Sequence, residues 1–335
     1  MARTLAGKWR ADGAAWRGLG RPGARAGRRA PVPAGISASG TEPRPKPPVF
    51  AGCLARALRA NGWTAPGIAL AIGLVGTPAV MSQTAHAGAW TYEAGTGQAI
   101  LQGSAVTSAN AFGPSSELFA SRSFDKVEAT LTFEYGLTDW LTLIAAPQLL
   151  YVDLGPPWPS SYAGPGYTDL GARARLWQGD GPLGAAVVSA QIVARLPGTG
   201  DSASAAAVGY QDAELDLRLL FGTSFMLWQK PAYLDLQIAQ RQRFGDPPDE
   251  LRFDATLGVR VAPRWQVLVQ SFNVISEGAG EGPDFSASYE YYKLQLSGAY
   301  DLSAALTVQV GIIGTVFARN APQETGAVAS ALYRF

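Results

Sequence analysis

Residues 126–152, KVEATLTFEYGLTDWLTLIAAPQLLYV, alternate apolar and polar side chains in steps of two. Before the turn at 137–139, the apolar series is Val127, Ala129, Leu131, Phe133 and Tyr135, and the polar series is Lys126, Glu128, Thr130, Thr132 and Glu134. A strict period of two indicates a β-strand with one apolar and one polar face. The alternation resumes after the short turn, which predicts a β-hairpin.

Runs of this kind recur along the whole chain after residue 97, so we expect an all-β fold. Twelve strands are predicted, at 98–110, 122–136, 140–154, 167–178, 183–197, 211–222, 231–244, 250–262, 265–276, 286–300, 305–318 and 325–335. The register is least secure around 222–231, where the connection is longer than the other turns.

The connections between these strands alternate in length. Short ones occur at 137–139, 179–182, 262–264 and 301–304, and long ones rich in Gly, Pro and Ser occur at 155–166, 198–209 and 277–285. Short turns at one rim and long loops at the other are typical of outer-membrane barrels, in which the short turns are periplasmic.

The N-terminal quarter differs from the rest in charge. Residues 1–87 hold 12 of the 27 basic residues and 2 of the 26 acidic ones, so residues from Gly88 onward have a net charge of −9. Within 51–87, Arg56 and Arg59 precede a short apolar run and the small residues Ala85 and Ala87. This order predicts a secretory signal peptide cleaved after Ala87. The apolar run is too short for a transmembrane helix, which needs about 20 residues.

Residues 1–50 are rich in Arg, Pro, Gly and Ala and have no hydrophobic period. Such a composition indicates a disordered segment. We expect it to be an upstream extension of the reading frame, with translation starting near Val49. A twin-arginine signal at Arg28 and Arg29 is the alternative, but the apolar run lies more than 30 residues further on.

The predicted mature chain, 88–335, contains neither Cys nor His, because Cys53 and His86 both precede the cleavage site. This excludes a Ser-His-Asp triad, a Cys nucleophile, a His base and the usual zinc sites. We therefore expect no enzymatic activity, no metal and no cofactor. The acidic body also argues against nucleic-acid binding, which needs a basic surface.

The two faces of the strands have different chemistry. A soluble sandwich would point its apolar face to a core, whereas a membrane barrel points it to lipid and encloses the charged face. The export signal and the aromatic residues near strand ends favour an antiparallel transmembrane β-barrel over residues 88–335. These aromatic residues suit interfacial girdles and are Tyr135, Trp140, Tyr151, Trp265, Tyr292, Tyr300 and Tyr333.

Several segments also resemble a known family. GAWTYEAGTGQAI, EYGLTDWLTL, YTDLGARARLW, RFDATLGVRVAPRWQVLVQSF and ARNAPQETG look like parts of the phenol meta-pathway degradation-type outer-membrane proteins. The resemblance covers nearly all of 88–335, although Ala318 replaces the Gly that usually precedes Arg319. It implies an outer-membrane channel or transporter that takes up aromatic or other hydrophobic compounds.

The charged face supplies the candidate site. If the barrel encloses it, the lumen is lined by Glu128, Glu134, Arg173, Arg175, Arg195, Glu214, Asp216, Arg218, Asp235, Arg241, Arg243, Arg252, Asp254, Arg260 and Lys293. Nine of these fifteen residues are basic, which predicts a weak preference for anions. Lumenal Arg residues also pair with acids on neighbouring strands, because opposite charges stabilise a sheet.

The leading hypothesis is a porin-like channel or transporter for small, hydrophobic or aromatic molecules in the outer membrane of a Gram-negative envelope. The alternative is a closed structural or surface-interaction barrel whose lumen is filled by side chains. A hydrolase is disfavoured by the missing His. We expect outer-membrane lipid and the barrel-assembly machinery as partners, with Tyr333 and Phe335 as the assembly signal and Phe335 at the periplasmic edge of the membrane.

Overall fold

The computed structural model describes residues 88–199 and 204–335. The predicted extension at 1–50 and the predicted signal peptide at 51–87, with Ala85 and Ala87, lie outside the described residues. The fold described below is therefore that of the predicted mature body.

Twelve long antiparallel strands form one sheet that closes on itself, because β1 pairs with both β2 and β13. The predicted fold class is confirmed. The strands are β1 (Gly97–Phe112), β2 (Leu118–Thr138), β3 (Leu141–Leu154), β4 (Ser160–Asp180), β5 (Ala185–Pro197), β6 (Glu214–Leu227), β7 (Lys230–Arg243), β8 (Glu250–Ala262), β9 (Trp265–Ser276), β10 (Glu290–Asp301), β11 (Leu306–Arg319) and β13 (Thr325–Arg334).

Two short elements complete this part of the chain. The two-residue strand β12 (Ala321–Pro322) pairs with the end of β1, in line with β13. The one helical turn in the described ranges, η1 (Ala205–Ala207), lies in the connection between β5 and β6. No helix in those ranges is long and apolar enough to cross a membrane.

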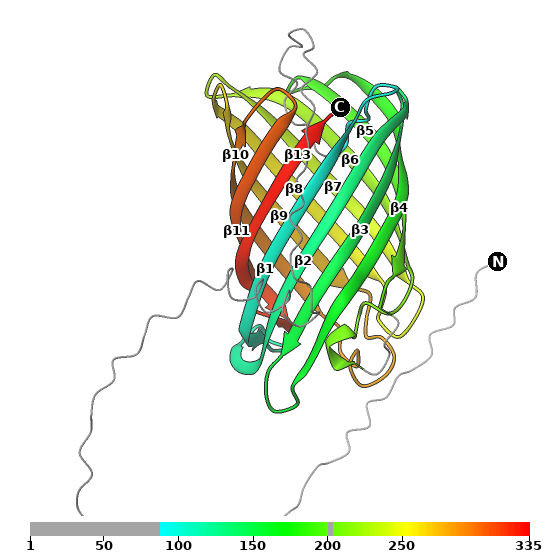
Figure 1. Ribbon diagram of the computed structural model, residues 1–335, viewed down its shortest axis with the longest axis vertical. Helices are drawn as coiled ribbons and strands as arrows, with labels where there is room; N and C mark the ends of the chain where they lie inside the picture. The colour runs from blue at the N-terminus through cyan, green and yellow to red at the C-terminus, as the bar shows by residue number, and fades with distance from the viewer. Residues whose placement is uncertain (1–87, 200–203) are drawn as a thin grey trace, which may run out of the picture. The chain divides into compact units, whose positions relative to one another are not determined.

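The connections sort to two rims, as Figure 1 shows. Tight turns join β2 to β3, β4 to β5, β6 to β7, β8 to β9 and β10 to β11. Both ends of the barrel chain meet at this short-turn rim, where the N–H of Gly97 donates to the carbonyl of Phe335 at 2.9 Å and the N–H of Phe335 donates back at 3.0 Å. The opposite, long-loop rim carries the connections at 155–159, 244–249 and 277–289, and the described parts, 198–199 and 204–213, of the connection between β5 and β6.

Several predicted boundaries were wrong, including the start of β10, which is Glu290 and not residue 286. The connection around 222–231 is a tight turn, because Trp228 and Gln229 both adopt positive φ and let β6 and β7 pair directly up to it. β4 begins at Ser160, so much of the predicted loop at 155–166 is strand, paired with β3 through a register shift at Pro147. β2 begins at Leu118, four residues before its prediction, and pairs there with the end of β1.

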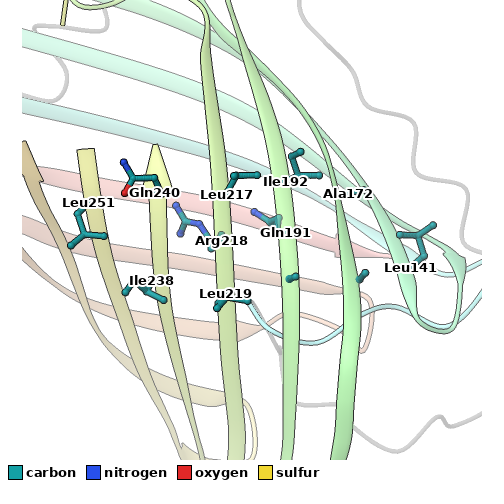
Figure 2. Close-up of a pocket in the computed structure, with 12 residues that line it drawn as sticks. Leu141, Ala172, Gln191, Ile192, Leu217, Arg218, Leu219, Ile238, Gln240 and Leu251 are labelled. Atoms are coloured by element: carbon teal, nitrogen blue, oxygen red, sulfur yellow. The ribbon is translucent and has the colours of Figure 1, made fainter. Parts of the chain in front are cut away.

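The outer face of the barrel is apolar. Large side chains such as Leu149, Leu217, Val310 and Ile312 are exposed on it. Figure 2 shows part of this face, where Ile192, Leu217 and Leu251 line a shallow groove that runs past Ala172. In a soluble protein an apolar surface that surrounds the whole sheet would be unusual.

Aromatic side chains flank this apolar surface at both rims. Tyr135, Trp140, Trp265, Tyr333 and Phe335 are exposed at or near the short-turn rim. At the long-loop rim, the rings of Tyr292 and Phe317 lie 5.6 Å apart. Two aromatic belts around an apolar band are the outer-surface pattern of transmembrane barrels.

Candidate functional site: the inner wall of the barrel

The strand register places the charged side chains on the face opposite to the apolar one. Of the fifteen predicted lumen residues, thirteen form ion pairs with one another or with neighbouring charged residues. The other two are Arg175, which donates to Gln178 near the short-turn rim, and Asp235, which accepts hydrogen bonds from Ala89 and Gln237.

The ion pair between Arg173 and Glu134 crosses a strand. Arg173 on β4 donates to Glu134 on β2 at 2.6 Å, and the strand between them carries Thr142, which is fully buried. A small residue at this position leaves room for two long side chains to meet above it. Gln98 on β1 also donates to Glu134, at 2.6 Å. The pair therefore couples four consecutive strands.

Glu214 on β6 is the centre of a larger network. Its carboxylate pairs with Arg195 of β5 at 2.8 Å and with Arg243 of β7 at 2.8 Å, and it lies 3.4 Å from Arg241. The hydroxyl of Tyr167 donates to it at 3.1 Å. A buried carboxylate tolerates burial only when its charge is matched and its lone pairs are satisfied, and Glu214 meets both conditions.

The network continues to β8. Asp216 accepts from Arg218 and Arg241, each at 3.1 Å, and Arg218 also reaches Asp254 at 2.7 Å. Glu250 lies between Arg241, Arg243 and Arg252, and it accepts from the hydroxyl of Tyr289 at 2.6 Å. The charged side chains of β4 to β8 therefore form one connected surface.

The sequence-based set of lumen residues was incomplete. It omitted five residues that pair with its members, namely Lys126, Asp169, Glu250, Asp301 and Glu324. Four of the five, all except Glu324, share the parity of the predicted charged positions on β2, β4, β8 and β10, so the alternation itself could have found them. Across the described residues the ion pairs use ten cationic and ten anionic side chains. The predicted excess of positive charge, and the weak anion preference that depended on it, therefore lose their basis.

Near the long-loop rim, Glu324 interacts with lysine side chains from β10 and β2. It lies between β12 and β13, and Lys293 of β10 donates to it at 2.6 Å. Burial alone would raise the pKa of the Glu324 carboxyl, but the ammonium groups of Lys126 and Lys293 outweigh burial and lower it below its ordinary value. Glu324 is therefore ionised at neutral pH.

One strip of the inner wall carries no charge. The inward residues of β11, β13 and β1 between the two rims are uncharged, and many of them are small. They include Gln309, Gly311, Val328, Ser330, Gln102 and Ser104. Since β11, β13 and β1 are adjacent, these residues form a continuous uncharged strip opposite the charged network.

The segment before β1, residues 88–96, lies inside the barrel near the short-turn rim. The carbonyl of Trp90 accepts from Arg173 at 3.0 Å, and the N–H of Tyr92 donates to Thr142 at 3.0 Å. The indole of Trp90 packs edge-on against Tyr233 with ring centroids 6.4 Å apart. These partners lie on the inner faces of β3, β4 and β7, so the segment fills this part of the lumen.

Tyr92 ties the segment to the Arg173 pair. Burial, together with the adjacent carboxylate of Glu134, raises the pKa of the Tyr92 phenol above its ordinary value. The phenol is therefore neutral and donates to Glu134. The N–H of Ala94 donates to Asp139 in the β2–β3 turn at 2.9 Å and fixes the segment where it enters the barrel.

The β5–β6 connection also turns inward, at the other rim. Ala206 of η1 packs on Leu150 and Val152, which face into the barrel from β3. The carbonyl of Gly209 accepts from Arg243 at 3.0 Å and holds the connection over the charged network. Burial raises the pKa of the Tyr210 phenol to about 12, so this ring is neutral where it meets the inner wall.

Among the described residues, no group of three or more His, Cys, Asp or Glu side chains is arranged to hold a metal ion. Most of the charged side chains on the inner wall pair with one another, and Arg175 and Asp235 instead form hydrogen bonds with uncharged groups. What the arrangement offers is a rigid, polar, partly obstructed interior, which suits binding or passage of a solute.

No protein-family model matches the sequence, and no curated protein matches it either. Among solved structures, the fold is similar to that of an outer membrane channel from Pseudomonas putida F1, with a TM-score of 0.62 and 15% identity, over 76% of this chain and 100% of that one. At this identity the similarity shows the fold, which is that of the outer-membrane β-barrels.

Two further barrels are more distant. The NanC porin has a TM-score of 0.41 and 7% identity over 71% of this chain and 100% of its own. The translocator domain of the autotransporter NalP from Neisseria meningitidis has a TM-score of 0.40 and 10% identity over 86% of this chain and 96% of its own. Scores this low carry no argument about function.

Proposed function

We propose that the protein is an outer-membrane channel or transporter for small, uncharged, hydrophobic or aromatic molecules, and not an enzyme. It is exported with a signal peptide cleaved after Ala87 and inserted by the barrel-assembly machinery. The location in a membrane is supported by the apolar outer face, which has aromatic residues at both rims. Lipid is the environment in which such a surface is stable.

The class of solute follows from the inner wall. The charged side chains of β4 to β8 are paired, so an ionic solute would have to compete with existing salt bridges for them. The strip on β11, β13 and β1 has no charge, and its polar groups are the neutral amides and hydroxyls of Gln and Ser residues such as Gln102, Ser330 and Gln309. A neutral molecule that moves along this strip meets no unpaired charges, which would otherwise hold water in its path. The resemblance to the phenol meta-pathway proteins points to the same class.

Flux measurements on reconstituted protein test this function. The neutral probe is a water-soluble aromatic alcohol larger than benzyl alcohol. Vesicles containing the purified barrel are expected to take up this probe faster than an aromatic carboxylate of equal size. Planar-bilayer recordings should give small single-channel currents with little preference for either ion sign, because the paired charges are balanced. Equal uptake of neutral and anionic solutes would contradict the proposed solute class.

A closed structural or surface-interaction barrel remains the second candidate, because one observation favours it. Residues 88–96 and the connection at 204–213 both fold into the interior, one at each rim. With the interior occupied at both ends, the barrel would conduct nothing. Absence of both ionic current and solute uptake in correctly folded protein would select this candidate over the channel.

A further inference from the structure

Asp235 differs from the other buried acids of the inner wall. Its side chain on β7 is only 2% exposed, yet no cation of the described chain lies within 4 Å of it. Glu134, Glu214 and Asp216, which are similarly buried, each pair with at least one Arg. A buried carboxylate without a cation in direct contact is costly, so a cation at hydrogen-bond distance would stabilise this position.

The backbone of residues 88 and 89 lies against this carboxylate. The N–H of Ala89 donates to Asp235 Oδ2 at 2.7 Å, and Gln237 donates to the other carboxylate oxygen. A Cβ added to Gly88 would come within 2.0 Å of Asp235 Oδ2. The φ of Gly88 is +104°, in the region that favours glycine. A side chain on residue 88 would therefore collide with the carboxylate of Asp235.

We propose that Asp235 is a buried binding site for a primary ammonium group, and that its ligand is the α-ammonium of Gly88 in the mature chain. The proposal rests on the predicted cleavage after Ala87 and does not depend on transport. Cleavage turns the neutral amide nitrogen of Gly88 into a positive charge, next to the residue whose N–H already binds Asp235. An ammonium group is a charge-assisted donor, so it matches the carboxylate better than an amide can.

Cleavage of the signal peptide would therefore change how residues 88–96 are held in the lumen. In the precursor, the nitrogen of Gly88 is an uncharged amide that continues into Ala87, so the carboxylate of Asp235 stays unmatched. Once the chain is cleaved, the ammonium completes the site and anchors residues 88–96 in the lumen through Asp235, Ser189 and Arg173. The obstruction at the short-turn rim is thereby a property of the mature protein.

Amine acylation tests the site without any transport measurement. The purified barrel in detergent is treated with an acylating reagent at neutral pH, and the N-terminal peptide is quantified by mass spectrometry, with the exposed Lys230 as internal reference. We expect the N-terminal residue to be Gly88 and its amine to react about tenfold more slowly than in the urea-unfolded chain, since an ion pair keeps the amine protonated. In Asp235→Asn the amine should react about as fast as in the unfolded chain.

Asp139→Asn is the matched control, because Asp139 binds the same segment at Ala94, away from the proposed site. This variant should keep the protection of the amine. A second variant with one Ala inserted before Gly88 moves the ammonium away from Asp235 and should lose the protection even if Asp235→Asn fails to assemble. The proposal is overturned if the mature chain begins at another residue, if the wild-type amine is unprotected, or if Asp235→Asn or the insertion is protected as well as wild type.

Discussion

The inner wall of the barrel has two halves with different chemistry. From β4 to β8, acids and bases pair across neighbouring strands, and Glu214 and Glu250 each contact three Arg side chains. On β11, β13 and β1, the inward positions between the rims are uncharged and many are small. The difference shows that one sheet can combine a network of paired charges with an uncharged surface, which is the surface proposed to carry the solute.

The inward-folded segments lie on the charged half. Residues 88–96 bind Thr142, Arg173 and Asp235, and the 204–213 connection is held by Arg243 and packs on β3. Charged groups bind backbone carbonyl and N–H groups more strongly than the neutral amides and hydroxyls of the uncharged strip do. The division of the wall therefore determines where the interior is filled.

The largest effect should come from removing the centre of the charged half. Glu214→Ala leaves Arg195, Arg241 and Arg243 without their shared carboxylate, and uncompensated buried charges cost about 3–5 kcal/mol. Ser330→Ala on the uncharged strip should change the free energy of unfolding by less than about 0.5 kcal/mol. Urea unfolding in lipid vesicles, followed by the heat-modifiable gel shift, measures both. Equal midpoints for the two variants would remove the distinction between the halves.

The next effect concerns passage along the uncharged strip. Ser330 lies on β13 between Gln102 of β1 and Gln309 of β11, so Ser330→Arg places an unpaired charge in the middle of the strip. We expect several-fold slower uptake of a neutral solute, because the charge holds water in the path. Ser330→Gln is the control for size and should slow uptake less. Similar uptake by wild type and Ser330→Arg would place the path elsewhere.

The alternation of side chains was sufficient to predict the strands and their two faces. All twelve long strands were found, because a period of two persists whichever medium the apolar face meets. The errors arose where local conformation overrides pattern. Trp228 and Gln229 form a turn at positive φ, although neither residue type favours that conformation. Gly164, Pro165 and Gly166 have the composition of a loop but lie in β4.

The candidate site was harder to predict than the fold. The alternation of side chains along β6 assigns Asp216 to the charged face, but it does not identify the partner of Asp216. The partner depends on the register between strands and on small residues, such as Thr142, that leave room for two long side chains to meet. Residues 88–96 carry no pattern of their own, and their position follows from contacts more than 40 residues away in the sequence. The balance of charge was missed for a different reason: Glu250 has the parity of the charged face but stands at the first position of β8, and Glu324 lies outside the strands, between β12 and β13.

A smaller, pH-dependent effect should separate the Glu324 cluster at the long-loop rim from the charged half on β4 to β8. Although burial alone would raise it, Lys126 and Lys293 hold the pKa of Glu324 below the ordinary value of a glutamate. Glu324 therefore stabilises the fold fully above that ordinary pKa, and its contribution is lost as the pH falls through the lower, folded pKa. Unfolding midpoints of wild type and Glu324→Gln should therefore differ at neutral pH and converge at strongly acidic pH. A constant difference across this range would show that Glu324 acts through its shape and not its charge.

The smallest effect is expected at the seam between the two terminal strands, on the uncharged half. Deleting Phe335 removes both backbone hydrogen bonds to Gly97, each worth about 1 kcal/mol, and the exposed ring at the short-turn rim. The remaining register between β1 and β13 still pairs ten residues of each strand, from Gln98 with Arg334 to Thr107 with Thr325, so the assembled barrel should stay closed. The loss should therefore appear in assembly, as a lower yield of folded barrel when cells are heat-stressed.

Phe335→Tyr separates the two contributions of this residue, because it keeps the backbone pair and an aromatic ring at the rim. If the barrel-assembly machinery reads the terminal aromatic residue, Phe335→Tyr should assemble like wild type, Phe335→Ala should assemble poorly, and Tyr333→Ala should fall between them. If the backbone pair alone matters, Phe335→Ala will match wild type while the deletion does not. Unchanged yield for the deletion under stress would rule out both roles, and closure would then depend only on the pairing of β1 with β13.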